Sequence, residues 1–281
     1  MKKSLSFLNF ADDNEKRLVS RVLESAEKNG ECEYVLPLFL NLREQKLVRD
    51  ALPSVFSSAF TFFGGFKTGE RRVLVLFPEY IMFTSLLEPG YVSADSEDIR
   101  RLCLDATEGI LCAVRIKCSE FEKLTHRDYM GALLALGIER STLGDIVLAS
   151  PHEAYVIATA KIGEFICDSL TSVGRASVSC ELVRDYSKLG LSHATSESVC
   201  VATSLRLDCV ISAITGISRE KSKALVSAGQ AELNYYSKAS PDDTVNDGDV
   251  ISVRGYGKYK IADTSAKTSK GKNRLTVLKY I

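Results

Sequence analysis

The sequence of 281 residues predicts an α+β protein built from three parts. Three observations lead to this prediction. Helical and strand-like segments mix in residues 1–92, strands and helices follow a fixed order in residues 93–183, and residues 204–281 read as short helices followed by strands. Residues 184–203 are rich in Ser and Thr and show little periodicity, so we expect a linker there.

The first part is predicted to be a small α/β domain. Residues 12–29 carry apolar side chains at helical spacing, and Asn29-Gly30 would end that helix. A second amphipathic segment covers residues 42–56, and residues 73–77 form an apolar run typical of a buried strand. We expect this domain to end within the turn-rich residues 88–98.

The middle part is predicted to be a ferredoxin-like plait, because its elements follow the order βαββαβ. Thr125 and Asp128 form a capping-box pattern at the start of its first helix. The predicted segments are strand 110–117, helix 125–138, strands 144–149 and 154–160, helix 162–170 and strand 176–182.

The same plait forms the RRM, which binds single-stranded RNA by stacking bases on aromatic residues of its sheet. In this sequence Tyr155, on the third strand, is the one aromatic residue suited to that role, and the first strand has none. The RRM-like plait is therefore predicted either to contact RNA through this face or to serve as a structural or protein-docking domain.

The last part is predicted to begin with two short helices. Residues 205–214 place their apolar side chains on one face, and Gly216 would end that helix. Ser218 would cap the second helix and Gly229 would end it. After it we expect a strand at residues 231–235, a turn at residues 246–249 and a second strand at residues 250–254.

The charge is distributed unevenly along the chain. The formal net charge is zero, but residues 200–281 contain thirteen Lys and Arg against eight Asp and Glu, which is a net charge of +5. The first 199 residues therefore have a net charge of −5. This asymmetry predicts that contact with a nucleic acid is concentrated in the last part.

Several residues of the last part resemble the RNA-binding domain named after small-subunit ribosomal protein S-four. The resemblance extends over more than fifty residues and implies an αL-motif RNA-binding domain. It rests on Arg206-Leu207-Asp208, on Ser218-Arg219 with Lys223, Leu225 and Gly229, and on Gly248-Asp249-Val250-Ile251-Ser252-Val253-Arg254-Gly255.

Other segments resemble the bacterial YlmH family, so that the similarity covers nearly the whole chain. The matching segments are residues 124–140, Gly144-Asp145-Ile146, Phe63-Gly64-Gly65 with Glu70-Arg71-Arg72, and Leu42-Arg43-Glu44-Gln45. This resemblance implies a role in ribosome-associated quality control. The implied partners are ribosomal RNA of the stalled large subunit, peptidyl-tRNA and a factor that tails the nascent chain. The family has also been linked to cell division.

The basic side chains of the last part are the predicted RNA contacts, since Arg and Lys bind phosphates. These contacts are Arg206, Ser218, Arg219, Lys221, Lys223, Arg254 and Lys258. A second surface, for RNA or for a protein partner, is predicted at His126, Arg127, Arg140 and Tyr155.

No catalytic residue, cofactor or metal site is predicted. The eight cysteines contain no Cys-x-x-Cys pair and read as small buried apolar residues, and none of the three histidines has a partner at zinc-ligand spacing. With no apolar run long enough to span a bilayer and no secretory signal, the chain is expected to be cytoplasmic. It is also expected to be a monomer.

Two other function classes remain open. One is a protein-interaction adaptor linked to cell division. The other is an RNA-modifying enzyme such as a pseudouridine synthase, because such enzymes carry a similar RNA-binding module and Arg206-Leu207-Asp208 mimics their catalytic motif. In those enzymes, however, the module precedes the catalytic domain, whereas here it comes last, which favours a structural role for Asp208.

Overall fold

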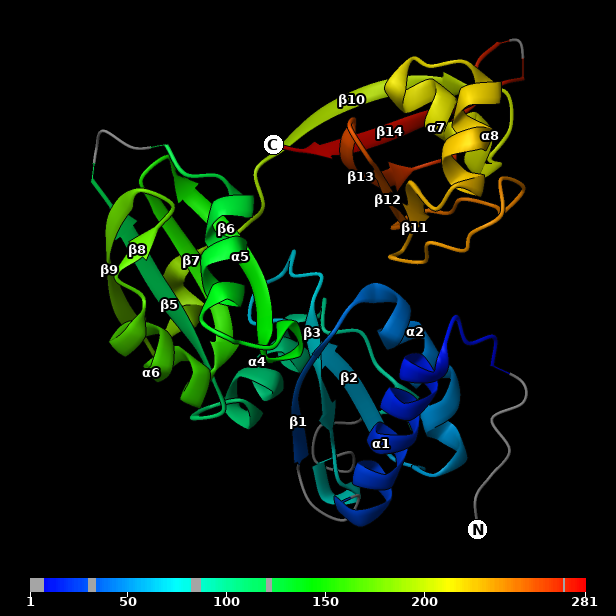
Figure 1. The fold of residues 1–281 in the computed structure, drawn as a ribbon. Helices are drawn as coiled ribbons and strands as arrows, with labels where there is room; N and C mark the ends of the chain where they lie inside the picture. The colour runs from blue at the N-terminus through cyan, green and yellow to red at the C-terminus, as the bar shows by residue number, and fades with distance from the viewer. Residues whose placement is uncertain (1–7, 30–33, 82–86, 120–122, 270) are drawn as a thin grey trace. The chain divides into compact units, whose positions relative to one another are not determined.

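The computed structural model describes residues 8–29, 34–81, 87–119, 123–269 and 271–281. The chain divides into two compact units, residues 1–193 and residues 194–281 (Figure 1).

The first unit begins with a four-stranded sheet in the order β1-β3-β2-β4. The predicted helix 12–29 is confirmed as α1, and the predicted amphipathic segment 42–56 forms α2 and then the short helix η1, which contains Pro53. With residues of the sheet, these helices enclose a buried apolar cluster. The exposed Pro37 lies in the edge strand β1, where its missing N–H is tolerated. The elements are α1 (Asp13–Asn29), β1 (Tyr34–Leu40), α2 (Leu42–Ala51), η1 (Leu52–Ser54), β2 (Ala59–Phe63), β3 (Arg72–Leu76) and β4 (Gly90–Tyr91).

The predicted βαββαβ order is confirmed in the rest of this unit. The strands form a sheet in the order β6-β7-β5-β9-β8, and one face of it packs on α5 and α6 (Figure 1). The Thr125–Asp128 capping box is present, with Thr125 N–H donating to Asp128 Oδ2 at 2.8 Å. The elements are β5 (Leu111–Cys118), α5 (His126–Ala135), η2 (Arg140–Thr142), β6 (Leu143–Ser150), β7 (Glu153–Thr159), α6 (Ala160–Ser169), β8 (Ser172–Val173) and β9 (Ala176–Val183).

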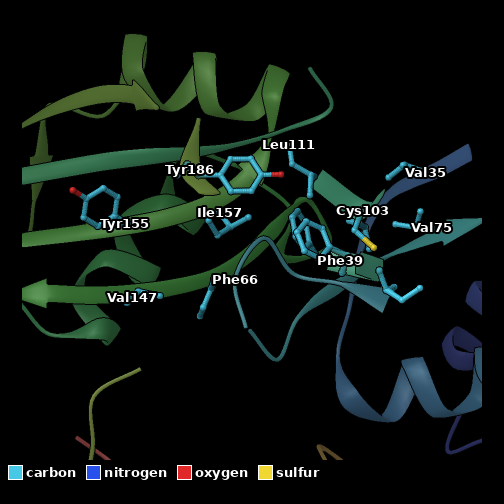
Figure 2. Close-up of a cluster of buried hydrophobic side chains, with 14 of the residues drawn as sticks. Val35, Phe39, Phe66, Val75, Cys103, Leu111, Val147, Tyr155, Ile157 and Tyr186 are labelled. Carbon is cyan, nitrogen blue, oxygen red and sulfur yellow. The ribbon is translucent and has the colours of Figure 1, made fainter. Parts of the chain in front are cut away.

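The two sheets of the first unit share an apolar core. Phe39 of β1 and Val75 of β3 belong to the same buried cluster as Val147 of β6 and Ile157 of β7 (Figure 2). Helix α4 (Glu97–Ala106) adds Cys103 to it. The parts predicted as separate domains, residues 1–92 and 93–183, are therefore joined through one core, which covers the second face of the plait sheet.

The second unit is a five-stranded sheet with two helices on one face. Its strand order is β10-β14-β13-β12-β11, and α7 and α8 pack on one side through an apolar cluster that includes Val210, Val226 and Ile261 (Figure 1). The elements are β10 (Thr195–Ala202), α7 (Leu207–Thr215), α8 (Arg219–Ser227), β11 (Ala231–Leu233), β12 (Val250–Val253), β13 (Gly257–Asp263) and β14 (Asn273–Tyr280).

The linker predicted for residues 184–203 is wrong at both of its ends. Residues Tyr186–Leu189 form the short helix η3, and the Tyr186 ring is buried with its hydroxyl 3.0 Å from Thr107 Oγ1. Residues Thr195–Ala202 form β10, which pairs with β14 along its full length. The polar composition of β10 reflects an edge strand whose side chains are mostly exposed, and not an unstructured segment.

Seven cysteines lie in the described part of the chain, and all seven are free thiols. Cys103, Cys112 and Cys209 are buried as predicted, whereas the other four are partly exposed. Burial raises the pKa of Cys112 to about 12, so this thiol stays protonated. Cys32 lies outside the described residues. Among the described helices, none has the length and apolar character needed to cross a bilayer.

Candidate nucleic-acid interface

The predicted RNA contacts gather where α7 and α8 begin. Arg206 is the N-cap residue of α7, and Gly216 ends that helix with a left-handed φ of 76° that a side chain would strain. Ser218 is the N-cap of α8, as predicted, and its hydroxyl accepts the backbone N–H of Lys221 at 3.3 Å. Ser218 is therefore occupied in holding the helix start.

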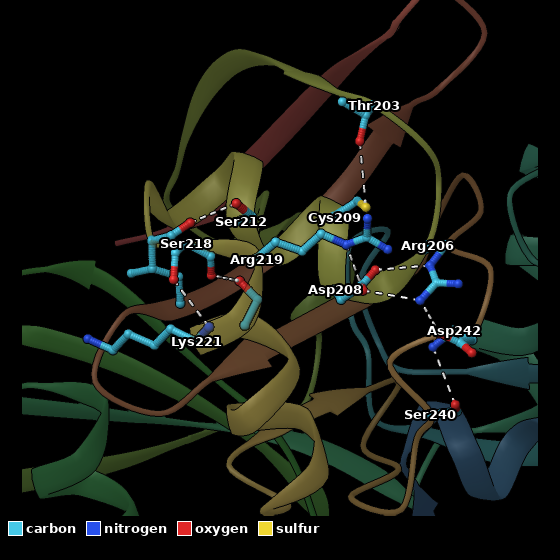
Figure 3. A network of polar contacts seen from close by, with 12 residues as sticks. Thr203, Arg206, Asp208, Cys209, Ser212, Ser218, Arg219, Lys221, Ser240 and Asp242 are labelled. Carbon is cyan, nitrogen blue, oxygen red and sulfur yellow. Dashed lines mark hydrogen bonds and ion pairs between the residues drawn. The ribbon is translucent and has the colours of Figure 1, made fainter.

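Asp208 is the centre of this region, because its buried carboxylate receives hydrogen bonds from two arginines (Figure 3). Arg206 donates from Nε to Oδ1 and from Nη2 to Oδ2, each at 3.2 Å. Arg219, eleven residues further along, donates from Nε to Oδ2 at 2.9 Å. Asp208 is only 1% exposed, so these charge-assisted bonds replace its contacts with water.

The electrostatic balance at Asp208 favours the ionised form. Burial raises the pKa of its carboxyl group, but the hydrogen bonds from Arg206 and Arg219 outweigh that effect and lower the pKa from 3.8 to about 2. The carboxylate is thus a permanent negative charge at neutral pH, and it fixes the direction of both guanidinium groups.

The two arginines are not equally available to a ligand. Arg206 also pairs with Asp242, and its side chain is 38% exposed. Arg219 is held through Nε, and its side chain is 56% exposed. Because a guanidinium has five N–H donors in a planar fork, Arg219 can keep its bond to Asp208 and still donate to a phosphate.

The lysines of α8 do not all share one face. Lys223 follows Arg219 by four residues and is exposed on the same side of the helix. Lys221 points the opposite way from Arg219, and its Nζ lies 5.8 Å from the centroid of the Tyr256 ring (Figure 3). The basic surface therefore continues from α8 to the turn between β12 and β13.

The two predicted contacts outside the helices lie in the β12–β13 region of the second unit. Arg254 is exposed at the end of β12, and its backbone N–H donates to Gln230 O just after α8. Lys258 is the neighbour of Tyr259, which is buried against the helices. Since successive side chains in a strand alternate, Lys258 lies on the face away from α7 and α8.

The prediction that Tyr155 stacks on RNA bases is wrong. Its ring is 9% exposed and belongs to the core that the two sheets of the first unit share (Figure 2). Its hydroxyl donates to Glu153 Oε1 at 3.0 Å. The open sheet face of an RRM is therefore replaced here by a packed one.

The other residues of the predicted second surface differ in whether their side chains turn inward or lie at the surface. Arg140 turns inward, because its Nη1 donates to Leu143 O at 2.8 Å and to Gly144 O at 2.9 Å. His126 and Arg127 are exposed in the first turn of α5. Only these last two remain available as a surface.

A buried polar cluster, which sequence reasoning missed, joins the two sheets of the first unit. Asp145 is 7% exposed and accepts the backbone N–H of Arg71 at 3.2 Å and that of Glu70. Arg71 in turn donates to Leu143 O at 3.1 Å and to Phe39 O at 2.6 Å. Buried charges that are paired in this way hold backbone segments in place.

The signal for this cluster was present in the sequence as separate short segments. Glu70-Arg71-Arg72 and Gly144-Asp145-Ile146 each place charges beside apolar residues, and Gln45, from a third segment, donates to Glu70 O at 2.6 Å. Gly144 allows this close approach, because a Cβ there would lie 2.8 Å from the Phe39 ring. The segments that resemble one family thus meet at the joint between the sheets.

Metal binding finds no support in the described residues, among which no three His, Cys, Asp or Glu side chains come together as ligands.

Comparison with known proteins agrees with the resemblance. A family described as "Putative RNA-binding domain in YlmH" matches residues 110–186. Ribosome-associated protein quality control protein P2 of Bacillus subtilis (strain 168) is 31% identical over 240 residues, which cover 85% of this chain and 84% of that protein. The solved structure of cell division protein ylmH from Streptococcus pneumoniae is 21% identical, with a TM-score of 0.42, and covers 62% of this chain and 94% of that one.

Proposed function

This chain belongs to the YlmH family, and from this premise we propose that it binds ribosomal RNA as a factor in the quality control of stalled large ribosomal subunits. The name of the Bacillus subtilis relative supports the ribosomal setting. The observation that carries the proposal is the buried Asp208, which holds Arg206 and Arg219 at the surface where α7 and α8 begin.

The partners proposed are ribosomal RNA of the large subunit, peptidyl-tRNA and a factor that tails the nascent chain, all of them in the cytoplasm. The proposal for peptidyl-tRNA and the tailing factor rests on the family resemblance. The chain's own chemistry supports the RNA contact, since the net charge of +5 in residues 200–281 gives the second unit a positive field.

The proposed contact with RNA is electrostatic and recognises the shape of the RNA. Arg219 and Lys223 are exposed cations on one face of α8, and Arg254 is an exposed cation whose backbone N–H donates to Gln230 O just after that helix. We propose that these three side chains bind phosphates of folded RNA. A-form RNA is recognised mainly through its backbone and shape, so contacts to base edges are not needed. If four to six phosphates are bound, log affinity falls against log salt with a slope of roughly −3 to −5.

The state of Asp208 supports a non-enzymatic role. A pseudouridine synthase needs an aspartate that reaches its substrate, and this carboxylate is 1% exposed and hydrogen-bonded to two arginines. Arg206-Leu207-Asp208 is therefore a structural motif at the start of α7, and we propose that the protein acts by binding.

The test is co-sedimentation of the full-length protein with large ribosomal subunits in sucrose gradients at about 150 mM salt. Lys223→Glu combined with Arg254→Glu reverses two exposed charges and leaves the Asp208 network intact. We expect this double variant to lose co-sedimentation, because two phosphate contacts become repulsive. Its melting temperature should match that of the unchanged protein.

Arg21→Glu combined with Lys28→Glu is the matched control, since both residues are exposed on α1 in the first unit. It makes the same change in net charge and should still co-sediment. Equal co-sedimentation of both double variants would contradict the proposed grip. Nuclease treatment adds a second arm: complexes that survive digestion of the RNA would indicate a protein adaptor and contradict RNA binding as the main activity.

A further inference from the structure

The outer face of the C-terminal sheet, the one away from α7 and α8, carries a cluster of two tyrosines around one lysine. We propose that this cluster, formed by Tyr235, Lys258 and Tyr280, is a second RNA contact at which unpaired bases stack on the two rings. The inference rests on the proposed function, because it assumes that the protein binds RNA. It adds a separate surface, which would bind unpaired RNA, to the proposed contact between the α8 side of the unit and the phosphates of folded RNA.

Strand register places Lys258 and Tyr280 side by side on this face. Tyr259 pairs with Lys279 and Lys260 pairs with Leu278, so the antiparallel register sets Lys258 opposite Tyr280. Tyr259 and Ile261 of the same strand point into the core beneath the helices. Lys258 and Tyr280 therefore point to the other side of the sheet.

The lysine connects the two rings. Lys258 Nζ donates to the hydroxyl of Tyr235 at 2.8 Å, and it lies 5.1 Å from the centroid of the Tyr235 ring. The same Nζ lies 4.8 Å from the centroid of the Tyr280 ring. The Tyr280 distance is within the range of a cation–π contact, and the hydrogen bond holds the Tyr235 hydroxyl, so one cation limits the motion of both rings before any ligand arrives.

Asn234 and Tyr235 are the two central residues of a tight turn in which Tyr236 N–H donates to Leu233 O at 2.9 Å, and a turn of this kind takes positive φ at both positions. Asn234 and Tyr235 have φ values of 51° and 65°, and a bulky residue is disfavoured in this left-handed region. The Asn234 side chain holds the turn by donating to Asp249 Oδ1 at 2.7 Å and accepting Val250 N–H at 2.8 Å. Glycine would adopt this backbone without strain, so the turn itself does not require an aromatic side chain at this position.

The surroundings of the cluster suit unpaired nucleotides. Lys260 and Arg274 add positive charge on the outer face of the central strands β13 and β14, by the same alternation. Val199 and Val201 on β10 are 49% and 48% exposed and add apolar area. Of the carboxylates of this face, Glu197 and Glu232 lie on the two edge strands, and the register shift in β13 sets Asp263 opposite Thr276. Aromatic rings beside cations bind single-stranded RNA through stacking and charge.

The first measurement is the affinity of the full-length protein for a fluorescein-labelled, unstructured oligouridylate of twelve nucleotides, by fluorescence anisotropy. Tyr280→Leu and Tyr235→Leu should each weaken binding about tenfold, because each removes a stacking ring. Tyr280→Phe and Tyr235→Phe keep the ring and should retain affinity within about threefold. Since stacking involves no charge, the salt slope should stay the same in the leucine variants.

Tyr80→Leu is the matched control, since Tyr80 is a 60% exposed tyrosine of the first unit, and it should bind as the unchanged protein does. Leucine variants that keep full affinity would overturn the stacking surface. So would phenylalanine variants that lose as much as the leucine variants, since the hydroxyl and not the ring would then be the contact. Melting temperatures of all variants check that the second unit is folded.

Failure of this inference is distinguishable from failure of the proposed function. If Lys223→Glu with Arg254→Glu loses ribosome binding while Tyr280→Leu keeps oligouridylate affinity, the helix-side grip stands and the stacking surface is wrong. A third outcome is that co-sedimentation with the ribosome survives nuclease treatment and is lost in Tyr280→Leu. The outer face would then bind protein and not RNA, which also overturns the inference.

Discussion

The plait sheet of the first unit and the sheet of the second unit each have one face covered by two helices, and they differ in what lies on the other face. The plait sheet meets the N-terminal sheet there, in a core that includes Phe39, Ile157 and Tyr155. The second sheet instead presents Lys258 and Tyr280 on that side. A tyrosine on a middle strand therefore contributes to the core in one sheet and to the surface in the other.

The position of an aromatic residue in a strand therefore does not define a binding face. Tyr155 sits where an RRM-like plait would stack a base, yet the N-terminal part of the chain excludes RNA from it. Tyr280, near the end of the last strand, belongs to no such motif but stands beside a cation. The packing partner of each sheet face decides which ring can meet a ligand.

Among the variants that distinguish the two sheets, Tyr155→Ala is expected to lower the free energy of unfolding most. Truncation of a buried aromatic side chain leaves a cavity in the shared core, and we expect a loss of about 3–4 kcal/mol in the free energy of unfolding. Affinity for oligouridylate should not change at temperatures where the variant is folded. Chemical denaturation measures the stability, and the anisotropy assay measures the affinity for oligouridylate.

Tyr155→Phe is the control for this variant, since it keeps the ring and removes only the hydroxyl that bonds to Glu153. Its loss of stability should be about 1 kcal/mol. A folded Tyr155→Ala variant with tenfold weaker RNA binding would contradict the burial of this face, because it would mean that the plait sheet opens to RNA.

The next largest effect concerns the helix side of the second sheet, at Asp208. Its carboxyl pKa is lowered from 3.8 to about 2 in the folded protein, so the ionised form stabilises the fold. That contribution is fully present above the unfolded pKa and is lost as the pH falls from about 4 toward 2. Because both arginine side chains are partly exposed to solvent, we expect Asp208→Asn to cost about 1–2 kcal/mol at pH 7.

The stability difference between Asp208→Asn and the unchanged protein should shrink when the pH is lowered from 5 toward 2, as urea titrations at several pH values would show. Asp247→Asn is the matched control, because Asp247 is an exposed residue of the same unit. An Asp208→Asn deficit that is constant over this range would mean that shape, and not charge, makes Asp208 important.

Much of the fold was predictable because periodicity and turn residues reveal single elements. The helices α1, α5, α7 and α8 and the plait strands follow from apolar spacing and capping residues. Strand β1 was missed because Pro37 argues against a strand, and the edge position that tolerates it is a property of the whole sheet. Strand β10 was missed because only its pairing with β14 orders its polar residues.

The site was predictable to the extent that its residues are close in the sequence. Arg206 and Asp208 are two residues apart, and their pattern was visible as a motif. The bond from Arg219 to the same carboxylate depends on how α8 packs beside α7. Tyr235 and Tyr280 are 45 residues apart in the sequence and meet Lys258 only through strand pairing, so no local pattern could reveal them.

The smallest changes in stability and RNA affinity are expected at Arg115, which lies at the exposed end of the plait face. Arg115 is a cation of the central strand β5, as Lys258 is a cation of the central strand β13. Arg115 hydrogen-bonds to Glu153, and its Nη1 lies 3.5 Å from Glu181 Oε2, so two carboxylates oppose its charge. The bond to Glu153 raises the pKa of Arg115 and makes this cation a poor donor to phosphate. Lys258 donates instead to the hydroxyl of Tyr235.

Arg115→Gln and Lys258→Gln remove the same charge from corresponding positions of the two sheets. We expect Arg115→Gln to change the melting temperature by less than about 3 °C, because partly exposed ion pairs contribute little. Its affinity for oligouridylate should stay within twofold, whereas Lys258→Gln should weaken binding about fivefold through the loss of one cation and the loosening of two rings. Equal losses in the two variants would mean that binding follows net charge alone, and the distinction between a packed and an open sheet face would then have no bearing on RNA.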